Sequence, residues 1–353
     1  MLAKLHNAGV GTKYLNFLSS YLQPRRAVVV VEGTVSDEIE IANQVFQGTV
    51  LGPPLWNSFF ADIAIPASSS GGKPSIFADD LNVFQKFDRG VENSKCRDVM
   101  ASCRSKVHQW GKVNRVTFDA GKEHIIVIHP VQGEGDPFKL LGCLVECKLV
   151  MQQAVEKMIS QIRPKVKAIL RTKTFYDAKE LVSQFKTHVW GLMEVHNGGI
   201  FHASTHILDR LDVIHYNFLR DLNLDPSEAF LKFNFAPPKL RRNIGILGLL
   251  HKRVLGLSHP LFQELLPFCS DVPGSFTQDQ HDKQLYGHLP DVNFQMVLYC
   301  RSIFAMTYIY NRLPQSVIDC RTISLFQRCL TKSAREACFA GDPDWVDFFS
   351  CRK

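Results

Sequence analysis

The adjacent carboxylates Asp79 and Asp80 constrain this chain most, because they lie between two short apolar runs. Residues 76–78 (Ile-Phe-Ala) precede the pair, and residues 81–84 (Leu-Asn-Val-Phe) follow it. Runs of this length around a polar turn are typical of a β-hairpin, which we expect to be buried. Two buried carboxylates side by side cost free energy unless a cation compensates their charge. The pattern predicts a divalent-metal site at the hairpin tip, with a solvated Asp-Asp turn as the alternative.

A glycine-containing segment lies upstream of this doublet, at residues 47–57 (Gln-Gly-Thr-Val-Leu-Gly-Pro-Pro-Leu-Trp-Asn). Gly48 permits close approach of the backbone to a ligand, and the prolines are suited to the start of a helix over residues 54–63. A glycine loop that leads into a helix favours phosphate binding. Alone, the segment is weak evidence, because Gly-Pro pairs usually just end a strand.

Together and in this order, the two segments resemble motifs of reverse transcriptases. Residues 47–57 resemble the Q-G-x-x-L-G-P-x-L-x-N motif, residues 77–80 resemble the Y/F-A-D-D catalytic turn, and residues 138–142 resemble the Y-x-x-L-G primer-grip strands. Four residues fall where the family has its W…N…F-N-x-x-K segment: Trp110, Asn114, Phe118 and Lys122. The pattern is most similar to the non-LTR, LINE-type retrotransposon enzymes. It is specific over residues 1–142 and looser beyond.

Some positions depart from the family pattern. Phe46 stands where proline usually precedes the glutamine, Asp119 replaces an asparagine, and residues 121–123 (Gly-Lys-Glu) replace a Ser-Lys-Thr pattern. Neutral variation and decay of the element both explain such changes. Group II intron and telomerase-type enzymes share the motif order, but the later helical pattern fits them less well.

The resemblance implies an α+β fold: a partial right-hand polymerase palm in residues 1–135, a basic helical thumb in residues 136–260 and a helical extension in residues 261–353. In this family the first metal-binding aspartate lies on a strand shortly before the helix that here begins at Leu2. We therefore expect an N-terminally truncated palm, whose fingers and endonuclease region belong to the parent protein. Apolar spacing predicts the palm elements: a helix over 2–22 broken near Gly9, a hairpin over 28–41, helices over 54–63 and 91–112, and a strand over 125–128.

The activity implied by the resemblance is RNA-directed DNA synthesis, a nucleotidyl transfer that uses two Mg²⁺ ions, deoxynucleotides, an RNA template and a DNA primer. Asp79 would bridge the ions and Asp80 would support the site, since Mg²⁺ prefers hard oxygen ligands. Lys122 would steady the leaving pyrophosphate, or would simply be a solvated lysine. Because the third carboxylate would come from the missing strand, we expect little or no activity from the isolated chain. Four residues would contact nucleotide or template: Gln47, Gly48, Phe77 and Ala78.

The net charge of +7 is concentrated in one third of the chain. Residues 136–260 hold 18 Lys and Arg against 11 Asp and Glu, whereas residues 1–135 are close to neutral at +1 and residues 261–353 at −1. Such a local basic field indicates a polyanionic partner, here an RNA–DNA hybrid. On a helix after Val150, an apolar stripe runs from Val155 to Leu170, and Pro164 is expected to kink the helix or start a new one. Three cations recur every four residues on another face and would contact a duplex backbone, unless they form an ordinary solvated surface: Arg163, Lys167 and Arg171.

The ten cysteines are scattered, as in a reducing nuclear or cytoplasmic compartment. No apolar run approaches the roughly 18 residues that span a bilayer, so no membrane partner is expected. Cys143 and Cys147 lack a second pair for a zinc site. Cys320, Cys329 and Cys338 are spaced nine residues apart, which would place them on alternate faces of a helix. We therefore expect them not to converge on one metal ion. His202 and His206 lack the glutamate of a zinc protease.

Two alternatives to a polymerase fragment remain. One is a catalytically inert nucleic-acid-binding remnant whose basic thumb still holds a duplex. The other is a decayed element that binds nothing. Salt-dependent binding of a hybrid, lost when Arg163, Lys167 and Arg171 are reversed in charge, distinguishes the first from the second.

Overall fold

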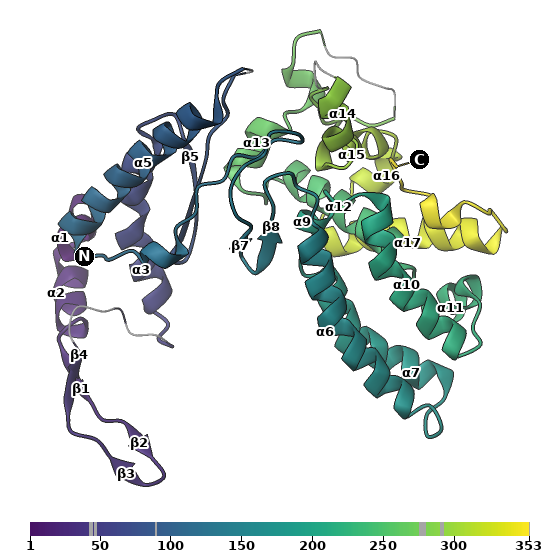
Figure 1. Cartoon of the computed structure of the whole chain (residues 1–353), viewed down its shortest axis with the longest axis horizontal. Helices are drawn as coiled ribbons and strands as arrows, with labels where there is room; N and C mark the ends of the chain where they lie inside the picture. Colours follow the sequence, from purple (N-terminus) through teal and green to yellow (C-terminus); the bar gives the residue numbers. More distant parts are fainter. Residues whose placement is uncertain (42–44, 46–47, 89, 275–279, 290–292, 353) are drawn as a thin grey trace. The chain divides into compact units, whose positions relative to one another are not determined.

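The computed structural model describes residues 1–41, 45, 48–88, 90–274, 280–289 and 293–352, which Figure 1 draws as ribbons. Gln47 and Phe46 lie outside the described residues. The chain divides into two compact units, Met1–Val127 and Ile128–Lys353, and each is described here by itself. Within the described parts, helices are combined with small two-stranded antiparallel sheets. The expected mixed helix-and-sheet composition is therefore confirmed, while the polymerase palm and the three-domain division stay predictions.

The first unit begins with two helices and a long β-ribbon. As predicted, the helix over residues 2–22 is broken: α1 (Leu2–Asn7) and α2 (Thr12–Tyr21) are separated near Gly9, whose φ is +88°. The predicted hairpin forms in two antiparallel pieces. Strand β1 (Arg25–Ala27) pairs with β4 (Ile39–Ile41), and β2 (Val30–Val31) pairs with β3 (Thr34–Val35) around a Glu32-Gly33 turn in which both residues have positive φ.

The centre of the first unit is a hairpin covered on one face by helices. Its elements are α3 (Gly52–Phe60), a 3₁₀ turn η1 (Ala61–Ile63), α4 (Ala64–Ser68), β5 (Lys73–Phe77), β6 (Asp80–Phe84) and α5 (Asn93–Asn114). The helices predicted over residues 54–63 and 91–112 are confirmed. Four buried residues form the core: Phe60, Ile63, Ala67 and Val107. The strand predicted over residues 125–128 is wrong, since these four residues, all described, follow the 3₁₀ turn η2 (Ala120–Lys122) without forming a strand.

The second unit starts with a short hairpin, β7 (Phe138–Leu140) and β8 (Cys143–Val145), and is otherwise helical. The π-helical turn η3 (Lys186–Trp190) joins α7 to α8, and short 3₁₀ turns η4 (Cys269–Asp271) and η5 (Trp345–Asp347) follow later. Its α-helices are α6 (Gln152–Arg171), α7 (Ala178–Phe185), α8 (Gly191–Glu194), α9 (Asn197–Ile200), α10 (Thr205–Asp221), α11 (Pro226–Phe233), α12 (Pro238–Val254), α13 (Pro260–Leu265), α14 (Asn293–Tyr299), α15 (Ile303–Tyr310), α16 (Gln315–Ile318) and α17 (Ile323–Phe339).

Two hydrophobic clusters hold this unit together. One packs α6, α7 and α10 around the buried rings of Phe185, Phe218 and Phe235. The other packs α12, α15 and α17 around Tyr310 and Phe326. The apolar stripe predicted on α6 is confirmed: Val155, Met158, Ile159, Ile162, Val166 and Ile169 are buried, and Leu170 is half-buried. Pro164 lies inside α6, which continues through it as one helix, so the predicted start of a new helix is wrong.

Candidate functional site

The aspartate doublet lies at the tip of the β5–β6 hairpin. The two strands pair from Lys73 opposite Phe84 to Phe77 opposite Asp80, which leaves Ala78 and Asp79 as a two-residue turn. Ala78 has a φ of +53°, in the left-handed region that residues other than glycine seldom adopt. A two-residue loop between paired strands requires such a dihedral angle. The hairpin predicted from the flanking apolar runs is confirmed.

The burial expected for this hairpin is wrong at its tip. Alternate strand residues face the core, where Ile76, Leu81 and Val83 pack against the buried cluster. The opposite face is open: Phe77 is 63% exposed, and both Asp79 and Asp80 are exposed. Helices cover only one face of this two-stranded sheet, so both carboxylates are open to solvent. Among the described residues, neither carboxylate pairs with a cationic side chain.

The doublet is joined to the glycine loop through a tryptophan. The indole Nε1 of Trp56, on α3, donates a hydrogen bond to the backbone carbonyl of Ala78 at 2.9 Å. Helix α3 begins at Gly52, whose amide bonds the carbonyl of Thr49 at 3.3 Å, so the turn after Gly48 leads directly into the helix that contacts the aspartate turn. Gly48 is exposed with a φ of +78°. The helical part of the first motif, residues 52–57, thus contacts the aspartate turn of the second.

A partly buried network of polar contacts holds α3 and η1 against α1 and α5. Asp62 accepts a hydrogen bond from Trp110 Nε1 at 3.0 Å and forms an ion pair with Lys4 at 2.7 Å. Lys4 also lies over the Trp110 ring, with its ammonium 4.7 Å from the ring centroid. Because helices from three separate segments meet at Asp62, this network sets the position of the helix that carries Trp56. Neither Lys4 nor Asp62 was predicted from the sequence.

The Trp-Asn-Phe segment has a structural role in this unit. Trp110 stacks edge-on against Phe60, Asn114 donates from its amide to the carbonyl of Trp110 at 2.9 Å, and Phe118 packs against Gly111. A Cβ on Gly111 would lie 2.7 Å from the carbonyl oxygen of Val116, so only glycine fits there. These contacts end α5 and turn the chain back along it.

Lys122 lies on the surface, next to Asp119. Its side chain is 85% exposed and its ammonium lies 3.7 Å from Asp119 Oδ2. Asp119 caps the turn η2 by accepting a hydrogen bond from the Gly121 amide at 3.0 Å. No ion pair joins Lys122 to Asp79 or Asp80 within the described part of the chain. Its role at a leaving pyrophosphate stays a prediction.

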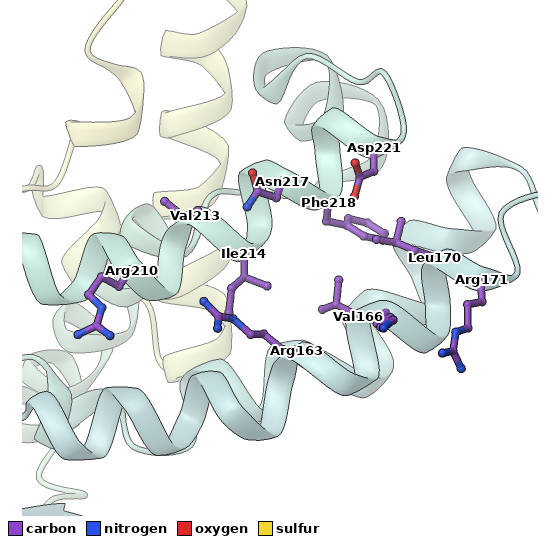
Figure 2. Close-up of a pocket in the computed structure, with 11 residues that line it drawn as sticks. Arg163, Val166, Leu170, Arg171, Arg210, Val213, Ile214, Asn217, Phe218 and Asp221 are labelled. Atoms are coloured by element: carbon purple, nitrogen blue, oxygen red, sulfur yellow. The ribbon is translucent and has the colours of Figure 1, made fainter.

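The second unit carries a groove between α6 and α10, with a volume of about 390 Å³. Figure 2 shows Val166 and Leu170 of α6 directed toward Ile214 and Phe218 of α10, which together form an apolar floor. The three cations predicted to contact a nucleic-acid backbone all line this groove, and all are exposed: Arg163, Lys167 and Arg171. In the described structure none of the three forms an ion pair.

A fourth cation of the groove, Arg210, was missed by the sequence analysis. It lies on α10 and forms an ion pair with Glu156 of α6 at 3.0 Å. The Gln152 amide and the Arg210 guanidinium both donate to Glu156, and these hydrogen bonds lower the pKa of that carboxyl group below its usual value. Arg210 lies on the polar face of α10, and the direction of that face depends on how α10 packs.

Side chains that could together form a metal site are not clustered in the described residues. These residues contain no group of three or more His, Cys, Asp and Glu side chains that could hold a metal ion. The expected separation of the spaced cysteines is wrong for one pair: Cys320 Sγ and Cys329 Sγ lie 3.7 Å apart. Cys320 precedes α17, whose N-cap is Thr322, so the helical spacing argument does not apply to it. No helix in the described chain is long and apolar enough to cross a bilayer.

Comparison with known proteins gives one relevant similarity. In an alignment 172 positions long, which covers 43% of this chain, the sequence is 27% identical to a Drosophila melanogaster protein named "Probable RNA-directed DNA polymerase from transposon X-element". This similarity supports a reverse transcriptase relationship. The match spans 18% of the length of that relative. No family model and no solved structure matches the chain.

Proposed function

We propose that the chain is part of the RNA-directed DNA polymerase of a LINE-type retrotransposon, with the β5–β6 turn as part of its nucleotidyl-transfer site. The observation that carries this proposal is the Trp56–Ala78 hydrogen bond, because it joins the helix that follows the glycine loop to the aspartate turn. The similarity to the transposon polymerase supports the same assignment. Gln47, Gly48, Phe77 and Ala78 are proposed to contact template and nucleotide.

Asp79 and Asp80 supply oxygen donors of the kind that Mg²⁺ binds, and one or two carboxylates with substrate phosphates are a common Mg²⁺ arrangement. Bound there, Mg²⁺ would stabilise the attacking and leaving oxygens of phosphoryl transfer. The described residues bring no third carboxylate to the doublet. We propose that this ligand comes from a segment of the parent polymerase outside residues 1–353. The isolated chain should therefore have little polymerase activity.

A primer-extension assay tests this part of the proposal. The full chain is incubated with Mg²⁺, deoxynucleotides and a DNA primer on an RNA template, alongside Asp79→Ala. Incorporation near background in both proteins is the expected result. Robust synthesis that disappears in Asp79→Ala would show that the centre is complete and would overturn the proposed incompleteness.

The alternative function, a nucleic-acid-binding remnant, is favoured by the α6–α10 groove. Its exposed cations lie along one helix at four-residue spacing, with about 6 Å of helix rise between successive cations. Guanidinium and ammonium groups arranged in this way neutralise backbone phosphates and release their counterions. This binding would be independent of catalysis, and Asp79→Ala should leave it unchanged.

Two lysines of α6 provide a matched test of the groove. Lys167 lines it, whereas Lys165 is also exposed on α6 but does not. Binding of a labelled RNA–DNA hybrid is measured against salt concentration for Lys167→Glu and Lys165→Glu. Lys167→Glu should weaken binding and reduce the salt slope by about 1, and Lys165→Glu should have a smaller effect. Equal effects of both variants, or binding that does not depend on salt, would exclude the groove.

A further inference from the structure

A second groove of about 550 Å³ lies along α17. It shares no lining residue with the α6–α10 groove. Two of its residues, Leu231 and Asn234, lie at the end of α11. The others belong to α17, drawn in yellow in Figure 1: Arg328, Thr331, Lys332, Arg335, Glu336 and Phe339.

The sequence of α17 separates an apolar face from a basic one. Phe326, Leu330, Ala334 and Cys338 recur every four residues and are buried. On the exposed side lie Arg328 and Lys332. The wall of the groove is fixed, because the Arg335 guanidinium donates a hydrogen bond to the Leu231 carbonyl at 2.5 Å and thereby joins α17 to α11.

Helix α17 is more positively charged than residues 261–353 as a whole. Residues 261–353 hold 9 Lys and Arg against 10 Asp and Glu, yet α17 holds three cations and one carboxylate. Arg328 forms no ion pair with any described residue. Lys332 lies 3.8 Å from Glu336, but both side chains are more than half exposed, and such exposed pairs contribute little. The groove therefore has cationic groups available to an anionic ligand.

An exposed aromatic ring marks one end of the groove. Phe339, the last residue of α17, is 82% exposed. A positively charged groove next to an exposed aromatic ring is the combination that binds single-stranded nucleic acid, because each base presents a flat face for stacking. A duplex keeps its base faces stacked inside, and an acidic peptide offers carboxylates without bases.

We propose that the α17 groove binds single-stranded nucleic acid. Arg328 and Lys332 contact successive phosphates, and an unpaired base stacks on Phe339. Asn234 also lines the groove and supplies an amide for a hydrogen bond to a base edge. This site is separate from the proposed hairpin centre and from the α6–α10 groove, and it does not depend on either.

The proposal is tested with the full chain and a fluorescein-labelled oligouridylate of about 12 nucleotides, a length within the range of single-strand sites. All measurements are made in a Lys167→Glu background, which weakens the α6–α10 groove. The double variant Arg328→Glu/Lys332→Glu should weaken binding about tenfold or more and reduce the salt slope by about 1 for each cation. Arg321→Glu is the matched control, because Arg321 is exposed and precedes α17 but does not line the groove.

The aromatic contact has its own variants. Phe339→Ala should weaken binding at least about fivefold, as expected for the loss of one stacked base. Phe339→Trp should retain binding, and its added indole fluorescence should be quenched by the RNA. Glu336→Gln, which removes the carboxylate, should tighten binding.

Three results would overturn the proposal: an equal loss in Arg321→Glu, no quenching in Phe339→Trp, or competition by polyglutamate as effective as that by unlabelled RNA. The last result would assign the groove to an acidic peptide instead. If Lys167→Glu alone affects hybrid binding, that result concerns only the α6–α10 groove. Failure of either groove can therefore be distinguished from failure of the other.

Discussion

The indole of Trp56 donates a hydrogen bond to the carbonyl of Ala78 at 2.9 Å, and this contact joins helix α3 to the aspartate turn. The bond holds a turn in which Ala78 has an uncommon positive φ. A helix side chain therefore controls the conformation of the backbone that presents Asp79 and Asp80.

Replacing Trp56 by Phe should loosen the aspartate turn. The variant keeps an aromatic ring but loses the donor, and a hydrogen bond of this kind contributes about 1 kcal/mol. Amide hydrogen exchange over residues 76–81 should accelerate about fivefold, while exchange in the second unit stays constant. Trp110→Phe, which loses the bond to Asp62 instead, is the control, and it should affect α1 and η1 more than the turn. Unchanged exchange at the turn in Trp56→Phe would contradict this role.

Removing Asp212 should strongly destabilise the second unit. Asp212 of α10 and Arg242 of α12 form two hydrogen bonds of 2.6 Å, and their side chains are only 6% and 5% exposed. Asp212→Ala leaves a buried guanidinium without its partner, at an expected cost of about 3–5 kcal/mol in the free energy of unfolding. Urea unfolding measures this loss. The double variant Asp212→Leu/Arg242→Met should recover most of the loss, since an apolar pair of similar volume needs no charge compensation.

Acidification should destabilise the second unit through His215. Burial among Phe185, Phe235 and their neighbours, with a smaller contribution from the positive charge of Arg241, lowers the pKa of His215 to about 3. Between pH 6.5 and about 3 the unfolded chain binds a proton at this imidazole that the folded chain does not bind. Stability from this group is therefore present above pH 6.5 and declines as pH falls through that window, by at most about 1.4 kcal/mol per pH unit.

The control for His215 is His215→Phe, which keeps an aromatic ring in the cluster. Thermal unfolding of both proteins is recorded from pH 7.5 to pH 4.5. The wild-type protein should lose more stability on acidification than the variant does. Burial lowers the pKa of His202 to about 4. This residue titrates in both proteins, so its contribution to stability cancels in the difference between them. Parallel curves for the two proteins would exclude a contribution of His215.

Replacing Arg352 should release the segment between α9 and α10. The Arg352 guanidinium donates to the carbonyls of Phe201 and Ala203, the latter at 2.8 Å, and lies 4.4 Å from the Phe201 ring centroid. Arg352→Ala leaves these acceptors without their donor, which should cost about 1–3 kcal/mol. Limited proteolysis near residues 201–204 should accelerate. Arg352→Lys should recover only part of the loss, because an ammonium cannot span both carbonyls as the planar guanidinium does.

Local periodicity predicted the features that depend on neighbouring residues, but not those that depend on long-range contacts. The stripe on α6 was evident because Val155, Ile159 and Ile162 repeat at helical spacing, and the β5–β6 hairpin was evident from its flanking apolar runs. The Asp212–Arg242 pair joins residues on two different helices, and no short-range pattern indicates it.

The candidate sites show the same limit. Charge spacing predicted Arg163, Lys167 and Arg171 on one face of a helix, and all three line the same groove of α6. Their contact with nucleic acid stays a prediction. The sequence left the exposure of Asp79 and Asp80 open between a buried metal site and a solvated turn, since it depends on what covers the hairpin tip. Cys320 and Cys329 come together because the chain turns at Thr322, a boundary that spacing alone does not indicate.

The β1–β4 ribbon has a practical consequence for any preparation of this chain. Its four consecutive valines, Val28–Val31, are each between 46% and 63% exposed, and Val35 opposite them is 58% exposed. Strand edges with unshielded aliphatic side chains recruit further strands, so copies of the protein should self-associate through this arm as concentration rises. Lysine at Val29 and Val31 would keep the molecules apart without touching either groove, and would make the binding experiments feasible at high concentration.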